Sequence, residues 1–462
     1  MFVKKSLVLF CDKWFTTFAL QTVIMVDLDA LYAYYKNFPS ICTDSRQVTK
    51  GCLFFALKGE RFDGNKFANQ VIADGAAYCV VDDPSLEGQP GMLVVQDVLK
   101  SLQELAKMHR RKFQIPIIAI GGSNGKTTTK ELVSAVLGSQ YPCHFTKGNL
   151  NNHIGVPLTL LAMPNNTEVA VIEVGANHIG EIEELCKIAE PTHGLLTNIG
   201  KEHLEGFGSL EGVKKAEGEL YRYLNRSGGC AFVNGTEKYL GSMSRVNRRK
   251  VTYKATENIH ESVDNLIIIR PKQYTPVVEV SFLGEQQQEI SVKSHLFGRH
   301  NFHNIASAIA LGIYFKVPGT KIKEAIEGYI PSNNRSQVIV NGSNTILLDA
   351  YNANPSSMEV ALASLVDMDA PNKIAILGDM LELGEHSEQE HTILIQKALK
   401  LPIKLIVLVG PIFGSLKIHN SRILYFNNAV ETREWLHTQK MNDSVLLIKG
   451  SRGIQLEKVL EK

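Results

Sequence analysis

The sequence has no strong excess of charge of either sign and no long apolar run. Its 462 residues include 49 Lys and Arg against 47 Asp and Glu, which gives a formal net charge of +2. Nucleic-acid-binding proteins usually carry a clustered basic excess, so this balance disfavours a nucleic-acid partner. No apolar run approaches the roughly 18 residues of a membrane-spanning helix, and we expect no membrane span.

The sequence also lacks the cysteine pattern of a disulfide framework or a zinc site. Its seven cysteines are odd in number and scattered, and none forms a C-x-x-C pair. Such cysteines are typical of reduced thiols in the core of a cytoplasmic protein, which is the location we expect. They are Cys11, Cys42, Cys52, Cys79, Cys143, Cys186 and Cys230.

The first 24 residues do not form a complete signal-peptide pattern. A short apolar run, Ser6 to Cys11, follows two lysines, but Asp12 interrupts it before it reaches the about 7–15 residues that a signal peptide needs. An acidic helix start follows Met25. We therefore interpret residues 1–24 as an extension in front of the first domain, which a start codon assigned too far upstream would explain.

Length and composition favour a globular enzyme of about three domains. Apolar residues make up 44% of the chain and charged residues 21%, which is ordinary for a globular protein. The hydrophobic pattern predicts an α/β fold in three parts. These are a small α/β domain over residues 25–108, a central domain over residues 109–330 and a C-terminal domain over residues 331–462.

The central domain has the pattern of a buried parallel sheet. Continuous apolar runs at 115–120, 169–174 and 195–199 alternate with helical segments. Strands of this kind belong to parallel sheets that are covered on both faces. Residues 265–293 differ, because short strands flank polar turns there. We predict an antiparallel appendage over this segment.

The C-terminal domain alternates strands and helices in a Rossmann-like pattern from residue 346 onwards. Asn354 and Pro355 predict a helix start, with Asn as the N-cap and Pro at the first helical position. The alternation ends in a predicted helix over residues 456–460. The domain has no G-x-G-x-x-G loop, so its pattern does not indicate dinucleotide binding.

The strongest local motif is a glycine loop between a strand and a helix. The run at 115–120 leads into Gly121-Gly122-Ser123-Asn124-Gly125-Lys126-Thr127, a shortened variant of G-x-x-x-x-G-K-[ST]. We expect the backbone N–H groups of Gly122 to Gly125 to cradle phosphate. Lys126 would reach the β- and γ-phosphates, and the Thr127 hydroxyl would bind Mg²⁺. The alternative is an ordinary turn between a strand and a helix.

Two further polar residues follow neighbouring strands. Glu173 lies at the end of the run at 169–174, where a carboxylate ligand for Mg²⁺ belongs beside such a loop. His203 lies in the polar loop after 195–199. From its spacing alone, His203 is either a ligand or a solvated side chain.

Five segments together resemble the Mur ligase family. They are Gly122–Lys130, Glu173–Ile182, Tyr351–Pro355, Leu377–Gly384 and Lys449–Gly453. The resemblance extends in order over residues 25–462. It implies an N-terminal UDP-substrate domain, a central P-loop parallel-sheet ATPase domain and a mobile C-terminal Rossmann-like ligase domain.

The resemblance also implies an activity. It implies an ATP-dependent amide ligase that joins D-alanyl-D-alanine to UDP-N-acetylmuramoyl-tripeptide in cytoplasmic peptidoglycan precursor synthesis. The implied cofactors are ATP and Mg²⁺, and we expect a monomer. A carboxylate is a poor acyl donor, so it is first phosphorylated and the dipeptide amine then attacks the acyl phosphate. The negative charge that gathers at that step calls for cations.

By position, the resemblance assigns candidate residues to the site. The implied catalytic residues are Lys126, Glu173, His203 and Glu217, and the implied metal ligands are Thr127, Glu173, His203 and Glu217. The implied ATP-binding residues are Gly122, Ser123, Asn124, Gly125, Lys126, Thr127, Thr128, Asn301, Asn304, Arg335, Asp349 and Tyr351. The implied substrate-binding residues are Ser45, Arg46, Asn151, Asn152, Asp379, Lys449 and Arg452, and a structural role explains Asp379, Lys449 and Arg452 equally well.

One position departs from the family pattern. The family usually has a lysine, carbamylated by CO₂, where this sequence has Glu217. A carbamate is a carboxylate-like anion on a lysine stem, whereas glutamate carries a permanent carboxylate on a shorter stem. Either Glu217 serves the second Mg²⁺ directly, or that metal is held differently. The alternatives are an alignment slip toward Lys214 or Lys215 and a solvated Glu217.

Two other functions stay open at this point. A folylpolyglutamate-synthase-like ligase would share the central and C-terminal domains, but the N-terminal segment Thr43–Arg46 argues against it. A non-catalytic nucleotide-binding paralogue would explain the missing lysine at Glu217. Four residues that are all present argue against that second alternative: Lys126, Thr127, Glu173 and His203.

Overall fold

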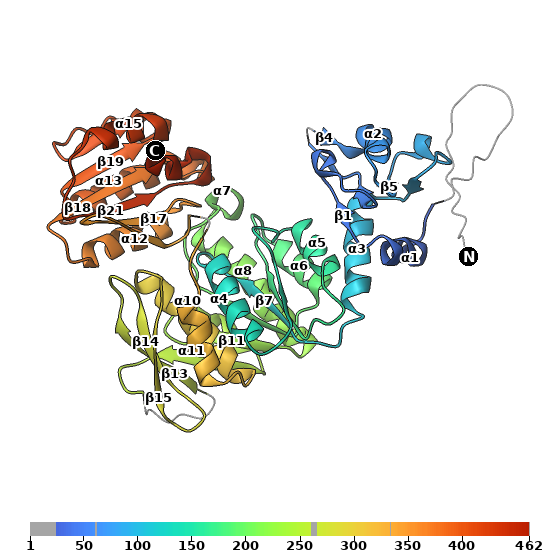
Figure 1. Cartoon of the computed structure of the whole chain (residues 1–462), viewed down its shortest axis with the longest axis horizontal. Coiled ribbons are helices and arrows are strands. Elements are labelled where there is room, and N and C mark those ends of the chain that lie inside the picture. The colour runs from blue at the N-terminus through green and yellow to red at the C-terminus, as the bar shows by residue number, and fades with distance from the viewer. Residues whose placement is uncertain (1–24, 61, 260–265, 333, 462) are drawn as a thin grey trace. The chain divides into compact units, whose positions relative to one another are not determined.

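The computed structural model describes residues 25–60, 62–259, 266–332 and 334–461 (Figure 1). The interpretation of residues 1–24 as an extension therefore falls outside the described residues. The chain separates into two units. Of the described residues, the first contains those from 25 to 115 together with 146–167 and 184–190, and the second contains those of 116–145, 168–183 and 191–461.

The first unit is built on a four-stranded parallel sheet in the order β1-β2-β5-β6. Helices α1 and α3 begin at aspartate caps, because Asp27 accepts a hydrogen bond from the N–H of Ala30 and Asp97 from that of Lys100. The prediction of an α/β fold is confirmed here. The elements are α1 Leu28–Asn37, β1 Ile41–Cys42, β2 Leu53–Phe55, β3 Lys58–Gly59, β4 Phe62–Asp63, α2 Ala68–Ala73, β5 Tyr78–Val81, β6 Met92–Val94, α3 Val98–Arg110 and α5 Gly155–Leu161.

The second unit contains a nine-stranded sheet in the order β15-β14-β13-β12-β11-β10-β7-β9-β8. Strands β7 to β13 are all parallel, whereas β13, β14 and β15 pair antiparallel. Both predictions are confirmed, and the antiparallel strands extend the parallel sheet. The strands are β7 Ile117–Gly121, β8 Cys143–Phe145, β9 Val169–Glu173, β10 His193–Leu196, β11 Cys230–Asn234, β12 Lys250–Ala255, β13 Leu266–Gln273, β14 Glu279–Leu283 and β15 Glu289–Lys293.

Helices from this part of the chain cover the nine-stranded sheet, and α10 and α4 pack against each other (Figure 1). Their buried faces share one core, in which Leu132 and Val136 of α4 meet Ile305 and Ile309 of α10. The glycine loop enters α4 and is thereby fixed at the end of β7. The helices are α4 Lys126–Gly138, α7 Leu204–Phe207, α8 Leu210–Ser227, α9 Leu240–Met243, α10 Arg299–Tyr314 and α11 Gly319–Glu327, whereas α6 Glu181–Ala189 begins in the second unit and continues in the first.

A six-stranded sheet, in the order β16-β17-β21-β18-β19-β20, forms the C-terminal part of the second unit. Asn354 caps α12 in a reciprocal capping box and Pro355 is its first residue, as predicted. The predicted helix over 456–460 is wrong in type, because this segment is a 3₁₀ helix. The elements are β16 Gln337–Asn341, β17 Asn344–Asp349, α12 Pro355–Asp367, β18 Asn372–Gly378, α13 Ser387–Leu399, β19 Leu405–Val409, α14 Pro411–Ser415, β20 Ile423–Phe426, α15 Ala429–Thr438 and β21 Ser444–Lys449.

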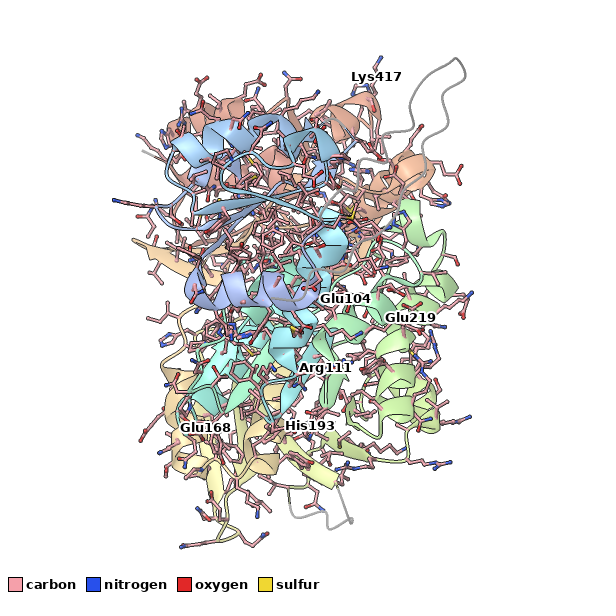
Figure 2. The ribbon with its side chains drawn as sticks, turned by 90° about the vertical axis from the view of Figure 1, so that its right-hand side faces the viewer. Glu104, Arg111, Glu168, His193, Glu219 and Lys417 are labelled. Atoms are coloured by element: carbon pink, nitrogen blue, oxygen red, sulfur yellow. The ribbon has the colours of Figure 1, made fainter. Side chains whose placement is uncertain are left out.

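Two expectations of the sequence analysis concern the cysteines and membrane spans. The six cysteines in the described part of the chain are free thiols, and all except Cys143 are buried. No described helix has the length and apolar character to span a membrane. Arg111, labelled in Figure 2, follows α3 and pairs with Glu190 at 2.5 Å within the first unit.

Candidate functional site

The glycine loop between β7 and α4 needs glycine at two positions. Gly122 and Gly125 have φ values of +111° and +81°, which other residues rarely adopt. A Cβ atom on Gly122 would lie 2.4 Å from Oγ1 of Thr197, and one on Gly125 would lie 2.6 Å from Oδ1 of Asn304. Conformation and close packing together therefore require both glycines.

Three backbone amides of the loop already have acceptors within the protein. The N–H of Gly122 donates to Glu217, that of Ser123 to the carbonyl oxygen of Asn198, and that of Asn124 to Oδ1 of Asn198. The role of the Gly122 to Asn124 amides in binding phosphate therefore stays a prediction, since in this structure they donate within the protein. The amides from Gly125 to Thr128 form the first turn of α4, where a helix leaves its N–H groups without carbonyl partners. A helix turn of this kind is suited to bind an anion.

Lys126 is folded back onto its own loop. Its Nζ donates to the carbonyl oxygens of Gly122 and Ser123 and lies 3.4 Å from Oε2 of Glu202. Burial by itself would lower the pKa of Lys126. The surrounding carboxylates, with Glu202 the strongest, outweigh that effect and raise it. Lys126 therefore stays charged.

Glu217 lies on α8 and points into the glycine loop. Only 1% of its surface is exposed, and its Oε2 accepts the Gly122 N–H at 2.7 Å. Burial raises the pKa of Glu217 to about 7, although the Lys126 charge acts in the opposite direction. The alternative of a solvated helix residue is wrong.

Glu219, labelled in Figure 2, is two residues further along α8 and serves a different element. Its two carboxylate oxygens accept the N–H groups of Gly180 and Glu183 at 2.8 and 3.0 Å. Glu219 thus stabilises the start of α6. The neighbouring carboxylates on α8 have separate roles, and Glu217 is the one that reaches the glycine loop.

Glu173 and Thr127 are brought together as predicted. Glu173 is the last residue of β9, and its Oε1 accepts the Thr127 hydroxyl at 3.3 Å. Its Oε2 lies 3.8 Å from Nζ of Lys130, a fully buried lysine one turn beyond Lys126 on α4. The Thr127 hydroxyl and the Glu173 carboxylate thus form a corner of oxygen donors beside the first turn of α4.

His203 does not join that corner in this structure. It has a φ of +41° at the start of α7, and its Nδ1 lies 2.9 Å from Oε2 of Glu382. The hydrogen bond from His203 lowers the pKa of Glu382. Across the described ranges, no three His, Cys, Asp or Glu side chains form a metal-holding group. The four candidate metal ligands are therefore not assembled as one cage.

The candidate asparagines of α10 are buried beneath the loop. Oδ1 of Asn304 accepts the Thr129 hydroxyl at 3.1 Å, and its amide nitrogen donates to Asn301 at 2.8 Å. Asn301 in turn donates to the carbonyl oxygen of Phe297 at 2.8 Å. This chain of hydrogen bonds links α10 to α4, so the two asparagines support the glycine loop from below.

The candidates of the C-terminal domain form a second cluster. The Arg335 guanidinium lies 3.5 Å from the ring centre of Tyr351, and Nη1 of Arg452 donates to the Tyr351 hydroxyl at 3.2 Å. Nζ of Lys449 lies 2.6 Å from Oδ2 of Asp349. Burial would raise the pKa of Asp349, but the Lys449 charge outweighs it and lowers the pKa.

Asp379 has a structural role. It is fully buried, and its two carboxylate oxygens accept the N–H groups of Ile412 and Phe413 at 2.9 Å each. Its backbone carbonyl accepts from Ser451 N–H, which ties it to the loop of Arg452. Asp379 thus shapes the loop that carries a candidate substrate residue, and its own carboxylate is occupied.

The remaining substrate candidates lie in the first unit. Ser45 and Arg46 begin a 3₁₀ turn, where the Arg46 side chain is 85% exposed and pairs with Asp44 at 2.7 Å. Oδ1 of Asn152 accepts the N–H of Gly155 at 2.9 Å and so orders the start of α5. Asn151 lies beside it in the same turn.

Sequence reasoning missed Asn198 and Glu202. Besides accepting two loop amides, Asn198 donates through Nδ2 to the Asn124 carbonyl oxygen at 2.8 Å. Glu202 is buried beside Lys126. Both follow β10, which pairs directly with β7. The position of polar residues just beyond a strand of the same parallel sheet was the signal that could have found them.

The fold and this loop define a nucleotide-binding enzyme of the P-loop type. Comparison with known families matches the Mur ligase middle domain over residues 120–312, the glutamate ligase domain of Mur ligases over 334–452 and the Mur ligase family catalytic domain over 38–118. The chain belongs to the Mur ligase family, and it is an ATP-dependent ligase.

Individual relatives match along nearly the whole chain. The UDP-N-acetylmuramoyl-tripeptide--D-alanyl-D-alanine ligase of Bacillus subtilis (strain 168) is 34% identical over 439 residues, which cover 91% of this chain and 92% of the relative. The MurF structure from Acinetobacter baumannii has a TM-score of 0.81 at 31% identity, covering 91% of this chain and 92% of that one. A MurF ligase structure from Thermotoga maritima in complex with ADP has a TM-score of 0.78 at 25% identity, covering 91% and 96%.

Proposed function

We propose that the first turn of α4, Lys126, Glu173 and Glu217 form the phosphoryl-transfer site of this ligase. The reaction that the chain catalyses is the addition of D-alanyl-D-alanine to UDP-N-acetylmuramoyl-tripeptide, with conversion of ATP into ADP and phosphate. The observation that carries the site proposal is the position of the Lys126 ammonium at the N-terminus of α4, with only 15% of the side chain exposed. A helix N-terminus and a lysine together favour a polyphosphate.

The chemistry proceeds in two transfers. The tripeptide carboxylate attacks the γ-phosphorus of ATP, and ADP leaves, so that an acyl phosphate forms. The dipeptide amine then attacks the acyl carbon, the C–O bond to phosphate breaks, and the amine loses a proton as the amide forms. Lys126 must leave the carbonyl oxygens of its loop to meet the γ-phosphate, where charge grows in the first transfer.

The chain's residues fit a Mg²⁺ ion at the corner formed by Thr127 and Glu173. Mg²⁺ prefers oxygen ligands and is usually held by one or two carboxylates together with substrate phosphates, so a full protein cage is not needed. The Thr127 hydroxyl and the Glu173 carboxylate supply such donors 3.3 Å apart. A Mg²⁺ ion there would supply positive charge to the phosphate oxygens. His203 and Glu217 would serve a second ion.

We assign the rest of the nucleotide to the C-terminal domain, residues 331–462. The Tyr351 ring would contact the nucleotide, and Arg335, stacked on that ring, would reach the phosphates. Asp349, kept ionised by Lys449, would accept hydrogen bonds from the ribose. Asn301 and Asn304, beneath the loop in residues 109–330, would contact the adenine side.

We assign the UDP-substrate to the domain over residues 25–108. The exposed Arg46 guanidinium in a helical turn is suited to a diphosphate, and Ser45 precedes it. Asn151 and Asn152 would contact the same substrate. Arg452, exposed at its loop, would meet the dipeptide.

We further propose that the enzyme works as a monomer in the cytoplasm. The buried free thiols suit a reducing compartment. Size-exclusion chromatography with light scattering would test the monomer. An apparent mass near twice the 51.2 kDa of the chain would contradict it.

The purified chain should be assayed for phosphate release with Mg²⁺, ATP, the UDP-linked tripeptide and D-alanyl-D-alanine, with the product identified by mass spectrometry. We expect sustained phosphate release and the pentapeptide product only when both substrates are present. Parallel reactions with a lysine-containing and a diaminopimelate-containing tripeptide define the third residue. Absence of a ligated product with both tripeptides would overturn the proposal.

A further inference from the structure

Glu202 is a buried carboxylate next to the phosphate-binding lysine, and the mechanism above does not use it. We propose that Glu202 is the resident counter-ion of Lys126, and that it links nucleotide binding to the C-terminal domain through the residues beside it. This inference rests on the proposed role of Lys126 in binding phosphate.

The contact itself is direct. Oε2 of Glu202 lies 3.4 Å from Nζ of Lys126, and only 4% of the Glu202 side chain is exposed. A buried ammonium needs an opposite charge close by, since water does not solvate it. Among the carboxylates that act on Lys126, Glu202 has the strongest effect. In the chain without nucleotide, Glu202 therefore forms an ion pair with the lysine that would bind the γ-phosphate.

The second carboxylate oxygen shows that this arrangement is incomplete. Oε1 of Glu202 is buried and has no hydrogen-bond partner in the described part of the chain. A buried acceptor without a partner costs free energy, and a single 3.4 Å contact recovers little of that cost. The Glu202–Lys126 pair is therefore easily displaced. When triphosphate takes Lys126, repulsion between the phosphate and Glu202 favours movement of this carboxylate away from the loop.

The residues on both sides of Glu202 bind the C-terminal domain. Nζ of Lys201 lies 2.5 Å from Oε1 of Glu390 on α13, and the Lys201 N–H donates to the Ser356 hydroxyl at 2.8 Å. On the other side, His203 lies 2.9 Å from Glu382. Lys201 and His203 thus contact the C-terminal domain, whereas Glu202 between them contacts Lys126 of the glycine loop.

This alternation makes the segment a mechanical link. With Lys201 and His203 held by the C-terminal domain, Glu202 is held against Lys126. Movement of Glu202 away from Lys126 must therefore shift or break the contacts of its neighbours. Thermodynamic reciprocity then requires that loosening those contacts also favours nucleotide binding.

The first test measures the Kd of the analogue AMP-PNP with Mg²⁺ by isothermal titration calorimetry. In Glu202→Gln, which keeps the shape and removes the charge, we expect binding roughly fivefold tighter or more, because phosphate no longer competes for Lys126. Glu202→Ala should change binding in the same direction. A residue with only a structural role would weaken binding and lower Tm instead, so unchanged or weaker binding in both variants overturns the inference.

The second test asks whether the link to the C-terminal domain exists. Glu390→Gln removes the charged partner of Lys201 and should also tighten AMP-PNP binding. In the double variant with Glu202→Gln and Glu390→Gln, the change in binding free energy should be smaller than the sum of the two single changes. Glu359→Gln is the matched control, because Glu359 pairs with Lys397 at 2.5 Å within the C-terminal domain alone. Additive effects, or equal effects of Glu390→Gln and Glu359→Gln, would overturn the link.

Failure of the inference can be told apart from failure of the proposed function. Lys126→Ala should weaken AMP-PNP binding. If Lys126→Ala leaves the Kd unchanged, the phosphate site itself is wrongly assigned, and the role of Glu202 falls with it. If Lys126→Ala weakens binding while Glu202→Gln does not tighten it, the phosphate site stands and the role of Glu202 is overturned alone.

Discussion

The N–H of Gly122 donates a 2.7 Å hydrogen bond to Oε2 of Glu217, a residue 95 positions further along the chain. This bond places a carboxyl group inside the glycine loop. The neighbouring lysines are placed differently, because Lys214 pairs with Glu211 at 2.6 Å and Lys215 is exposed. The contact therefore favours Glu217 over either lysine as the anion of the site.

We predict that the enzyme needs Mg²⁺ but does not respond to bicarbonate. A carbamylated lysine forms reversibly with CO₂, whereas Glu217 carries its carboxylate without it. Ligation rates should be measured in CO₂-depleted buffer, with and without added bicarbonate. A strong bicarbonate response of the wild-type chain would indicate that Lys214 or Lys215 is carbamylated, and it would contradict the role given to Glu217.

Glu217→Gln should raise the Mg²⁺ concentration that gives half-maximal rate and should lower kcat. Gln keeps nearly the same shape and can still accept the Gly122 N–H, so the change removes mainly the charge. Steady-state rates over a Mg²⁺ titration check this. Glu211→Gln, on the exposed side of the same helix, is the control. Equal Mg²⁺ dependence of the two variants would argue against a metal role.

Lys126→Ala should lower kcat at least about 100-fold. Its ammonium meets charge that grows in the transition state, so kcat should fall more than KM for ATP rises. The measurement is the initial ligation rate at saturating substrates. A variant that ligates at close to the wild-type rate would show that Lys126 does not contact the transferred phosphoryl group.

Acid should destabilise the chain partly through His193, labelled in Figure 2. Burial against Tyr314 and Phe315 lowers the pKa of His193 to about 4 from its ordinary 6.5. Between these values the unfolded chain binds a proton that the folded chain does not, so stability is lost as pH falls from about 6.5 to about 4.

The measurement for His193 is Tm as a function of pH. His193→Gln should be less sensitive to pH across this window, with a difference on the order of 2 kcal/mol at its acid end. His419→Gln is the control, because His419 is exposed. Parallel Tm profiles of the wild type and His193→Gln would contradict the prediction.

Asp379→Ala should destabilise the C-terminal domain rather than remove a substrate contact. The change leaves the amides of Ile412 and Phe413 without their carboxylate acceptor, at a cost of about 1–3 kcal/mol. Thermal unfolding should show a lower Tm, and KM for D-alanyl-D-alanine should stay unchanged. Asp369→Ala, at an exposed position, controls for the loss of charge. A large rise in KM with an unchanged Tm would instead identify Asp379 as a substrate ligand.

Nucleotide and UDP-substrate together should compact the molecule. The glycine loop precedes the segment after α11, whereas Arg335, Asp349 and Tyr351 follow it. ATP must therefore contact residues on both sides of that segment, which requires the two sides to close on the nucleotide. Small-angle scattering with AMP-PNP, Mg²⁺ and the UDP-linked tripeptide measures the change. A radius of gyration that does not fall from that of an open resting state would count against closure.

Local pattern was sufficient for the elements that carry the site. The apolar run before Gly121, the alternation of strands and helices after residue 346, and the Asn354-Pro355 helix start were all predicted from neighbouring residues and are confirmed. These features depend on hydrophobic period and on backbone preference, which act over a few residues. The pairing of Glu173 with Thr127 also followed, because residues at the ends of adjacent parallel strands meet at one edge.

Only the tertiary structure decided which polar groups form hydrogen bonds or ion pairs with one another. The hydrogen bond from Gly122 to Glu217, the contact of Glu202 with Lys126 and the capture of the Ser123 and Asn124 amides by Asn198 all join segments about 75 to 95 residues apart. Such pairings depend on the order of strands in the sheet, because this order sets which polar groups lie close together. Burial then favours hydrogen bonds between these neighbouring groups, since water is excluded. The sequence determined that a phosphate loop exists, and only the packed sheet decided which anions hold its lysine.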